Sequence, residues 1–195
     1  MVEEIEVGRE FFAQLEREDE AIAARVKAGG CAWCEGPLYR SDYDRKPRGA
    51  FVAGAAEEFV VRHSLCCGRE GCRRRSTPPS LRFLSRRVYV GAVVIVASMV
   101  ALALKAAGAI RKATGVPART TRRWLGWWQV GFVQTEVFVA VAARLVGVSI
   151  DALPTSIVER LPGTTEQRLR TMLDLLAPIT TTSVVDGARF LRARS

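Results

Sequence analysis

Several patterns that mark common enzymes are missing from this sequence. It has no Walker-type phosphate loop, no Gly-x-Gly-x-x-Gly, and neither the His-x-Glu nor the Pro-Cys-x-x-Cys element of nucleic-acid deaminases. Its single histidine is His63, so a Ser/His/Asp or Cys/His catalytic arrangement would have to use that residue, and nothing points to it. We therefore expect a protein that is not an enzyme.

A secretory start is also missing. The first six residues, Met1 to Glu6, are acidic and lack the apolar core of a signal peptide. The five cysteines are an odd number, which does not suit a framework of paired disulfides. We expect a cytoplasmic, reducing location, where clustered cysteines favour a metal over disulfides.

Lysine is scarce, although the chain is basic. Only four of the 29 basic residues are lysines, and with 20 acidic residues the net charge is +9. Arginine binds phosphate with two parallel hydrogen bonds and recognises guanine edges. A GC-rich genome would explain arginine over lysine but not the excess of positive charge. The composition therefore favours a nucleic-acid partner ahead of a membrane surface.

Two short cysteine hairpins lie about thirty residues apart. Cys31-x2-Cys34 has the usual spacing of a zinc hairpin, and Gly36 after it allows a tight turn around sulfur. The second hairpin is either Cys67-x4-Cys72 or Cys66-x5-Cys72. Adjacent residues of an extended segment point to opposite faces, so one of the pair should bind metal. We favour Cys67, because it gives the shorter loop, and expect one structural Zn2+ held by four thiolates.

Other uses of these residues stay open. His63 could replace one thiolate, although a strand or surface histidine is the simpler interpretation. Cys31-x2-Cys34 could be a redox pair, but the strand-to-helix setting of such pairs is missing around Cys31. The thiols could also be buried without a common role.

A basic run follows the second hairpin. Arg73, Arg74 and Arg75, together with Arg69, Arg82, Arg86 and Arg87, make this the most basic part of the chain. Contact with nucleic-acid phosphates and a merely solvated basic face are both open interpretations.

The apolar pattern predicts mostly helices. Residues 9–28 read as a helix that Gly29-Gly30 ends, and residues 58–66 as a strand leading to the second hairpin. The uncharged run 88–104 is shorter than the ~20 residues of a membrane span, so a buried core helix is favoured over an anchor. Further helices are expected over 130–147 and 157–161, from the Thr164-Thr165-Glu166-Gln167 cap through Leu176, and in the basic tail 184–195.

Residues 106–128 match a helix-turn-helix. A helix over about 106–114 meets a break at 115–117, where Gly115 suits the left-handed turn position and Val116 can fill the core. The helix that follows, about 118–128, opens with small and polar residues. We expect its DNA-facing residues to be Arg119, Thr120, Thr121, Arg122 and Arg123. Trp124, Trp127 and Trp128 are expected to be core or interface residues.

Together these patterns predict a mainly α protein with a small β zinc-ribbon subdomain and a helix-turn-helix core. The expected divisions are an N-terminal helix (1–30), the zinc-ribbon-like subdomain (31–87), the helix-turn-helix domain (88–147) and a helical C-terminal extension (148–195).

Residues 31–128 resemble a known arrangement. The two cysteine hairpins, the second ending Gly-Cys-Arg-Arg-Arg, the segment Pro-Pro-Ser-Leu-Arg-Phe-Leu at 78–84 and a helix-turn-helix ending Arg-Arg-Trp resemble the zinc-ribbon and helix-turn-helix head of bacterial insertion-sequence transposases. They also resemble stand-alone, arginine-rich bacterial proteins associated with mobile elements. The resemblance implies that the 118–124 helix reads DNA, and that the zinc ligands are Cys31, Cys34, Cys67 (or Cys66) and Cys72. Such transposases continue into an acidic-triad nuclease domain, which this sequence does not contain, so catalysis is not implied.

The expected function is that of a non-enzymatic, zinc-containing protein that binds double-stranded DNA. Its role would be that of a transposition accessory factor or a transcriptional repressor, with a transposase or another mobile-element protein as a second partner. One alternative is a scaffold that binds another protein through its apolar and Trp-rich helices. Another is a zinc protein anchored in a membrane by residues 88–104.

Overall fold

The computed structural model describes residues 8–45, 58–84 and 89–181. Within them the chain is mainly helical with two small antiparallel sheets, which confirms the predicted mainly α class with a small β part. The helices are α1 (Arg9–Ala28), α3 (Gly91–Leu104), α4 (Ala107–Thr114), α5 (Ala118–Gly126), α6 (Glu136–Ala142), α7 (Thr155–Val158) and α8 (Thr165–Leu176), with short helical turns η2 (Trp127–Gly131), η3 (Phe132–Gln134) and η4 (Ala177–Thr180). The strands are β1 (Leu38–Arg40), β2 (Tyr43–Asp44), β3 (Val61–Arg62), β4 (Leu65–Cys67) and β5 (Arg75–Ser76).

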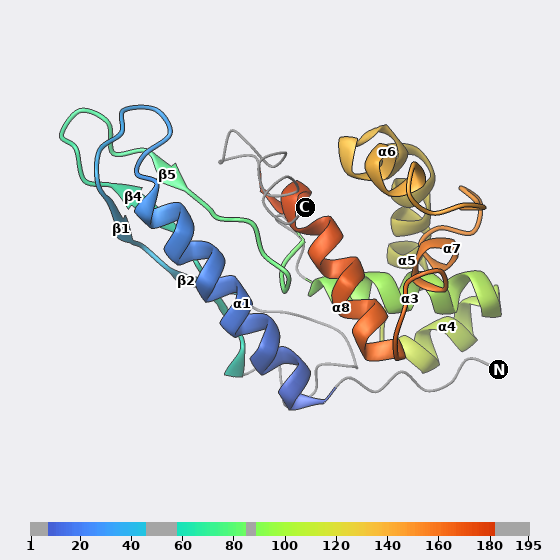
Figure 1. Cartoon of the computed structure of the whole chain (residues 1–195). Helices are drawn as coiled ribbons and strands as arrows, with labels where there is room; N and C mark the ends of the chain where they lie inside the picture. Colours follow the sequence, from blue (N-terminus) through green and yellow to red (C-terminus); the bar gives the residue numbers. More distant parts are fainter. Residues whose placement is uncertain (1–7, 46–57, 85–88, 182–195) are drawn as a thin grey trace.

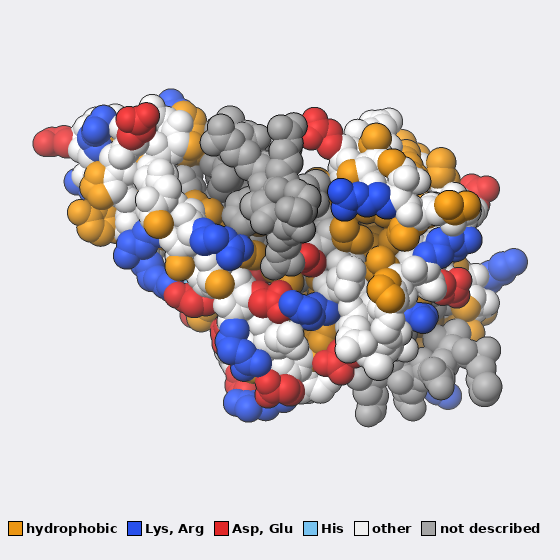
Figure 2. All heavy atoms as spheres, viewed as in Figure 1, with side chains coloured by type: hydrophobic (Ala, Val, Ile, Leu, Met, Phe, Trp, Pro, Cys, Tyr) orange, Lys and Arg blue, Asp and Glu red, His pale blue; other side chains and the backbone are white. Residues whose placement is uncertain are grey.

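Helix α1 has the bounds that the sequence predicts. Phe11, Phe12 and Leu15 are buried along one side, and the helix ends where Gly29 and Gly30 follow. Its outer side is highly charged, and acidic and basic side chains lie close together over α1 on the face that Figure 2 shows. One such pair joins Arg17 to Glu10, with 2.9 Å between nitrogen and oxygen.

The strands form two separate sheets. The larger has the order β1-β4-β5 and the smaller pairs β2 with β3, all antiparallel. In Figure 1, β1, β4 and β5 lie at one end of the molecule, whereas α4, α5 and α6 lie at the other. A small cluster of buried residues lies beneath the larger sheet and is separate from the main core; it comprises Cys31, Leu38, Leu65 and Cys67.

The predicted strand over 58–66 is two strands. β3 ends at Arg62 and β4 begins at Leu65, and the two belong to different sheets. The backbone N–H of Ser64 between them donates to the Asp42 carboxylate at 2.9 Å, and the Ser64 carbonyl accepts from Ser41. These contacts to the β1–β2 connection hold the chain at the point where it passes from one sheet to the other.

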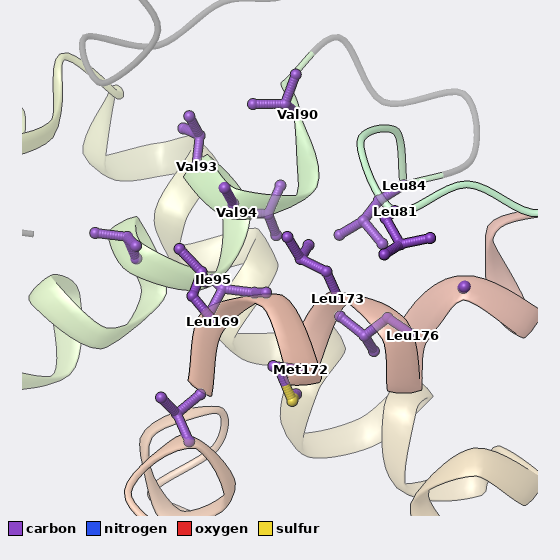
Figure 3. Packing of buried hydrophobic residues seen from close by; sticks show 14 of the residues in the cluster. Leu81, Leu84, Val90, Val93, Val94, Ile95, Leu169, Met172, Leu173 and Leu176 are labelled. Atoms are coloured by element: carbon purple, nitrogen blue, oxygen red, sulfur yellow. The ribbon is translucent and has the colours of Figure 1, made fainter. Parts of the chain in front are cut away.

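The apolar run forms α3, a helix in the main core. All of its residues from Gly91 to Ala97 are buried, and its side chains face those of α8, as Figure 3 shows for Val94, Ile95 and Leu173. Its 14 residues rise about 21 Å, which is short of the roughly 30 Å hydrocarbon layer of a bilayer. Among the described residues, no helix is both long and apolar enough to cross a membrane.

Helices α4 and α5 and the break between them lie where the sequence predicts. Gly115 has φ +65°, the left-handed conformation that favours glycine, and caps the end of α4. Val116 is fully buried, and its N–H donates to the Thr114 hydroxyl at 3.1 Å. Pro117 precedes α5, which packs against both α3 and α4. The buried Val116 anchors the turn from which α5 begins.

The helix predicted over 130–147 is interrupted. Helix α5 runs on through η2 and η3 to Gln134, and Thr135 is extended before α6 begins. The Thr135 hydroxyl accepts from the Phe138 N–H at 3.2 Å, which is a helix cap and explains the break. The predicted capping box at Thr164 and Gln167 is present at the start of α8, whereas the tail predicted over 184–195 lies outside the described residues.

A buried ionic network joins the sheets, α1 and the main core. Asp19 accepts from the Leu81 N–H at 2.7 Å, from the Ser80 hydroxyl at 2.7 Å and from Arg82 Nε at 2.9 Å. Arg82 also donates to the carbonyls of Phe59 and Val61, and pairs with Glu16. Asp19 and Arg82 are each 1% exposed. From the sequence, Arg82 is expected to be part of a basic surface. That expectation is wrong, because the side chain is buried.

Candidate metal centre and basic helix surface

Four cysteine sulfurs converge where the two hairpins meet. The sulfurs of Cys31, Cys34, Cys67 and Cys72 all lie within 4.8 Å of one another. Cys31 Sγ lies 3.8 Å from Cys72 Sγ, and Cys34 Sγ lies 3.5 Å from Cys67 Sγ. These distances exceed the roughly 2.05 Å of a disulfide, and all five cysteines are free thiols. Four sulfurs at about 2.3 Å from a central zinc lie about 3.8 Å apart, so the cluster has the dimensions of a tetrahedral thiolate site.

The first hairpin turns tightly after α1. The Cys31 N–H donates to the Gly36 carbonyl at 2.9 Å, and the Glu35 N–H donates to the Cys31 carbonyl at 2.7 Å. Glu35, at φ +59°, takes the left-handed position of this turn. Gly36 is needed for a different reason, because a Cβ there would lie 3.2 Å from Cys67 Sγ and 3.3 Å from Cys34 Sγ.

The second hairpin is delivered by β4 and closed by a short loop. Cys67 ends β4, and its sulfur accepts the Arg69 N–H at 3.4 Å. The Cys72 N–H donates to the Arg69 carbonyl at 3.1 Å, and Gly71 is left-handed at φ +79°. This N–H contact helps to fix the position of the Cys67 sulfur.

Cys66 does not belong to the cluster. It precedes Cys67 in β4, so its side chain points to the opposite face of the sheet, and its thiol lies 3.5 Å from the Arg73 carbonyl. The sequence left Cys66 and Cys67 as alternatives with Cys67 favoured, and the geometry selects Cys67. Cys66 as a ligand is therefore wrong.

His63 lies apart from the sulfurs. It is buried, and its Nδ1 lies 3.3 Å from Asp42 and its Nε2 3.5 Å from Glu20. Burial raises the pKa of Asp42, but the N–H of Ser64 and the contact with His63 outweigh it and lower the pKa. His63 thus joins the sheet region to α1, as a structural histidine would.

The pKa values of Cys31 and Cys72 are shifted in opposite directions. Burial raises the pKa of Cys31, but the N–H groups of Trp33 and Cys34 and the neighbouring thiols outweigh it and lower the pKa to about 7. At Cys72 the N–H of Arg74 lowers the pKa, but the Cys34 thiol and burial outweigh it, so that the pKa is raised. Thiolates this close repel one another, so keeping all four ionised requires a bound cation.

The arginines after the second hairpin are exposed. Arg73, Arg74 and Arg75 all face solvent, and among the described residues no carboxylate lies within 4.0 Å of their guanidinium nitrogens. Arg74 lies over the ring of Trp33 at 5.2 Å, and Arg75 over the ring of Tyr43 at 5.7 Å. Contacts with aromatic rings, which the sequence did not indicate, therefore orient two of the three arginines.

Helix α5 exposes three of the five residues expected to face DNA. Arg119, Arg122 and Arg123 are exposed, and Thr120 is half-buried. Thr121 is 1% exposed, and its hydroxyl donates to the Ala118 carbonyl at 2.9 Å. The expectation for Thr121 is therefore wrong, because this position lies on the side of α5 that packs against the core.

The tryptophans of this region belong to the protein's own core. Trp124 and Trp128 are buried, and Trp127 is half-buried against the core. The Trp128 indole N–H donates to the Ser98 hydroxyl in α3 at 3.1 Å, and Tyr89 meets Trp124 edge to face at 5.0 Å. These rings hold α5 on α3, which confirms the prediction of core residues.

No protein-family model matches the chain, and neither curated proteins nor solved structures gave a match. What the chain binds must therefore be inferred from its own residues and their geometry.

Proposed function

We propose that this chain is a non-enzymatic, zinc-containing protein that binds double-stranded DNA. The metal is assigned from the donor set, because four thiolates in a tetrahedral array suit Zn2+ or iron. In the proposal Cys31, Cys34, Cys67 and Cys72 hold one zinc ion, which stabilises a zinc ribbon. Metal analysis of the purified chain tests this part: one zinc per chain supports it, and a coloured iron protein contradicts the choice of metal.

The observation that carries the DNA-binding proposal is the outer surface of α5. Arg119, Arg122 and Arg123 are exposed, and no carboxylate among the described residues forms an ion pair with them. The opposite side of α5 is fixed by the buried Trp124, and the turn before the helix is anchored by the buried Val116. A short helix that is rigid on one side and cationic on the other suits the recognition helix of a helix-turn-helix.

The surrounding sequence supports the same assignment. Residues 71–135 contain twelve basic residues and no aspartate or glutamate. Among the described basic residues of this stretch, only the buried Arg82 forms an ion pair, whereas Arg17 on α1 pairs with Glu10. In addition, no side chain caps the N-terminus of α5, an end of the helix whose dipole favours a phosphate.

Replacing the α5 arginines should weaken binding to duplex DNA. We expect Arg122→Ala to raise the Kd about 5- to 150-fold if the side chain contacts a base, which corresponds to about 1–3 kcal/mol. Fluorescence anisotropy with a labelled duplex at fixed salt would measure the change. Arg17→Ala is the matched control, because it removes the same charge from α1 and should leave the Kd unchanged. Equal Kd values for Arg119→Ala, Arg122→Ala, Arg123→Ala and the control would contradict the proposal.

The biological role proposed for this binding is that of a transposition accessory factor or a repressor, with a transposase as a second partner. The resemblance of residues 31–128 to transposase heads supports it. Selection from a pool of random duplexes would identify the preferred DNA. Enrichment of a defined site found at the ends of mobile elements supports the role, and recovery of unrelated sequences contradicts it.

A protein-binding scaffold is the alternative, and one observation favours it. Val130, Val139 and Val146, in and around α6, are exposed hydrophobic residues. Co-purification of a stoichiometric protein that is lost with Val139→Asp, together with unaltered binding after Arg122→Ala, would favour this alternative.

A further inference from the structure

The outer face of the three-stranded sheet carries an aromatic ring beside an arginine. The strand register places Tyr39, Cys66 and Arg75 side by side on this face. The residues of the opposite face include Leu38, Cys67 and Leu65, all of which are buried. Tyr39 is 59% exposed, so its ring is accessible on this face.

The Tyr39 ring is held in place although it is exposed. A Cβ on Gly68 would lie 2.2 Å from Tyr39 Cε2 and 2.7 Å from its Cδ2, so the ring lies directly on the Gly68 backbone. The glycine leaves just enough room for the ring to rest on the sheet. A ring fixed in this way loses little conformational entropy when a second planar group stacks on it.

Arg75 on this face, and its neighbour Arg74 in the chain, are also oriented. Arg75 lies over the Tyr43 ring at 5.7 Å and donates to the Ser41 hydroxyl at 3.2 Å. Arg74 lies over the half-exposed Trp33 ring at 5.2 Å. A guanidinium whose face rests on a ring still directs N–H groups outward, toward an anion.

The charge of this face differs from that of its neighbours. Arg40, which follows Tyr39 but belongs to the opposite face, forms ion pairs with Glu20 and Asp42. Over the described part of the chain, no such ion pair engages Arg74 or Arg75. The outer face therefore has the exposed Tyr39 ring and, on Arg75, a positive charge that is held in place and forms no ion pair with a described carboxylate.

We infer that this face binds an unpaired strand of DNA, with a base stacked on Tyr39 and an adjoining phosphate at Arg75. A fixed ring beside oriented arginines fits a single strand, whose bases offer their faces, whereas the bases of a duplex are stacked inside it. The inference extends the proposed function and takes from it only the class of ligand, since α5 and this face lie on different elements. The chain would then contact duplex DNA through α5 and an adjoining unpaired segment through the sheet.

Anisotropy titrations of the zinc-loaded full chain with a labelled 15-nucleotide oligothymidine would test this. We expect Tyr39→Ala and Tyr39→Leu to raise the Kd for the oligothymidine about tenfold, which is within the range for the loss of one base–ring stack. Tyr39→Phe keeps the ring and should bind like the parent. None of the three should change the Kd for a blunt duplex by more than about twofold, and zinc content would show that each variant is folded.

The two claims fail separately. Unchanged oligothymidine binding after both Tyr39→Ala and Tyr39→Leu, or no binding of oligothymidine by the parent chain, overturns the inference even if duplex binding depends on α5. If the parent chain binds oligothymidine through Tyr39 but does not bind duplex DNA, the proposed function is overturned and the inference stands. If Arg122→Ala raises the Kd for oligothymidine as much as Tyr39→Ala does, the single strand and the duplex share one surface, and the inference is wrong.

Discussion

Removing the metal is expected to unfold the sheet region and leave the helices around α3 intact. The strands are two or three residues long, and their buried cluster consists of Leu38, Leu65, Cys31 and Cys67, the last two being proposed ligands. Structural zinc contributes about 10–16 kcal/mol in small zinc domains, more than this small cluster can supply. Hydrogen exchange should show that amides of β1, β4 and β5 lose protection in a zinc chelator, while those of α3 keep it.

Two adjacent cysteines provide the matched pair for this prediction. Cys67→Ser should lose the metal and reproduce the exchange pattern of the chelated protein. Cys66→Ser should retain one metal per chain and the protection of the parent, because the Cys66 thiol points to the other face of β4. Metal retention in Cys67→Ser together with metal loss in Cys66→Ser would show that the ligand assignment is reversed.

Asp19→Ala is expected to be the most damaging single change outside the metal site. It removes the carboxylate that accepts from Arg82, Ser80 and Leu81, and leaves the Arg82 guanidinium buried without its main counter-charge. Breaking a buried ion pair on one side costs about 3–5 kcal/mol, a large share of the stability of an ordinary domain. Urea unfolding would measure the loss in the free energy of unfolding.

The control for Asp19 lies on the same helix. Glu10 pairs with Arg17 on the exposed side of α1, so Glu10→Ala should not change the midpoint of urea unfolding. Asp19→Asn keeps the shape but loses the charge and should fall between the parent and Asp19→Ala. An Asp19→Ala variant as stable as Glu10→Ala would mean that the network does not join the sheets to the core.

Features with a local cause could be predicted from the sequence. The bounds of α1 followed from its apolar spacing and Gly29-Gly30, and the α4–α5 break from Gly115 and Val116. The choice of Cys67 over Cys66 followed from strand alternation and loop length. Each of these depends on residues close together in the chain, where spacing carries the information.

Features that depend on distant residues could not be predicted. Asp19 lies among other charged residues of α1 and looks like part of its solvated side, yet it is buried against Arg82, 63 residues away. Thr121 sits between polar neighbours, and only the packing of α5 on α3 and α4 shows that it is buried. The ring of Tyr39 over Gly68 likewise requires the register of β1 with β4.

The salt dependence of duplex binding tests the central claim most directly. For the zinc-loaded chain we expect the logarithm of the association constant to fall linearly with the logarithm of salt concentration, with a slope of about −0.9 per phosphate contacted. Replacing Arg119, Arg122 and Arg123 together by alanine should weaken binding at every salt concentration, with a slope shallower by roughly one for each arginine that contacts phosphate. A chain that ignores duplex DNA at low salt, or whose affinity and slope are unchanged in the triple variant, would contradict the account.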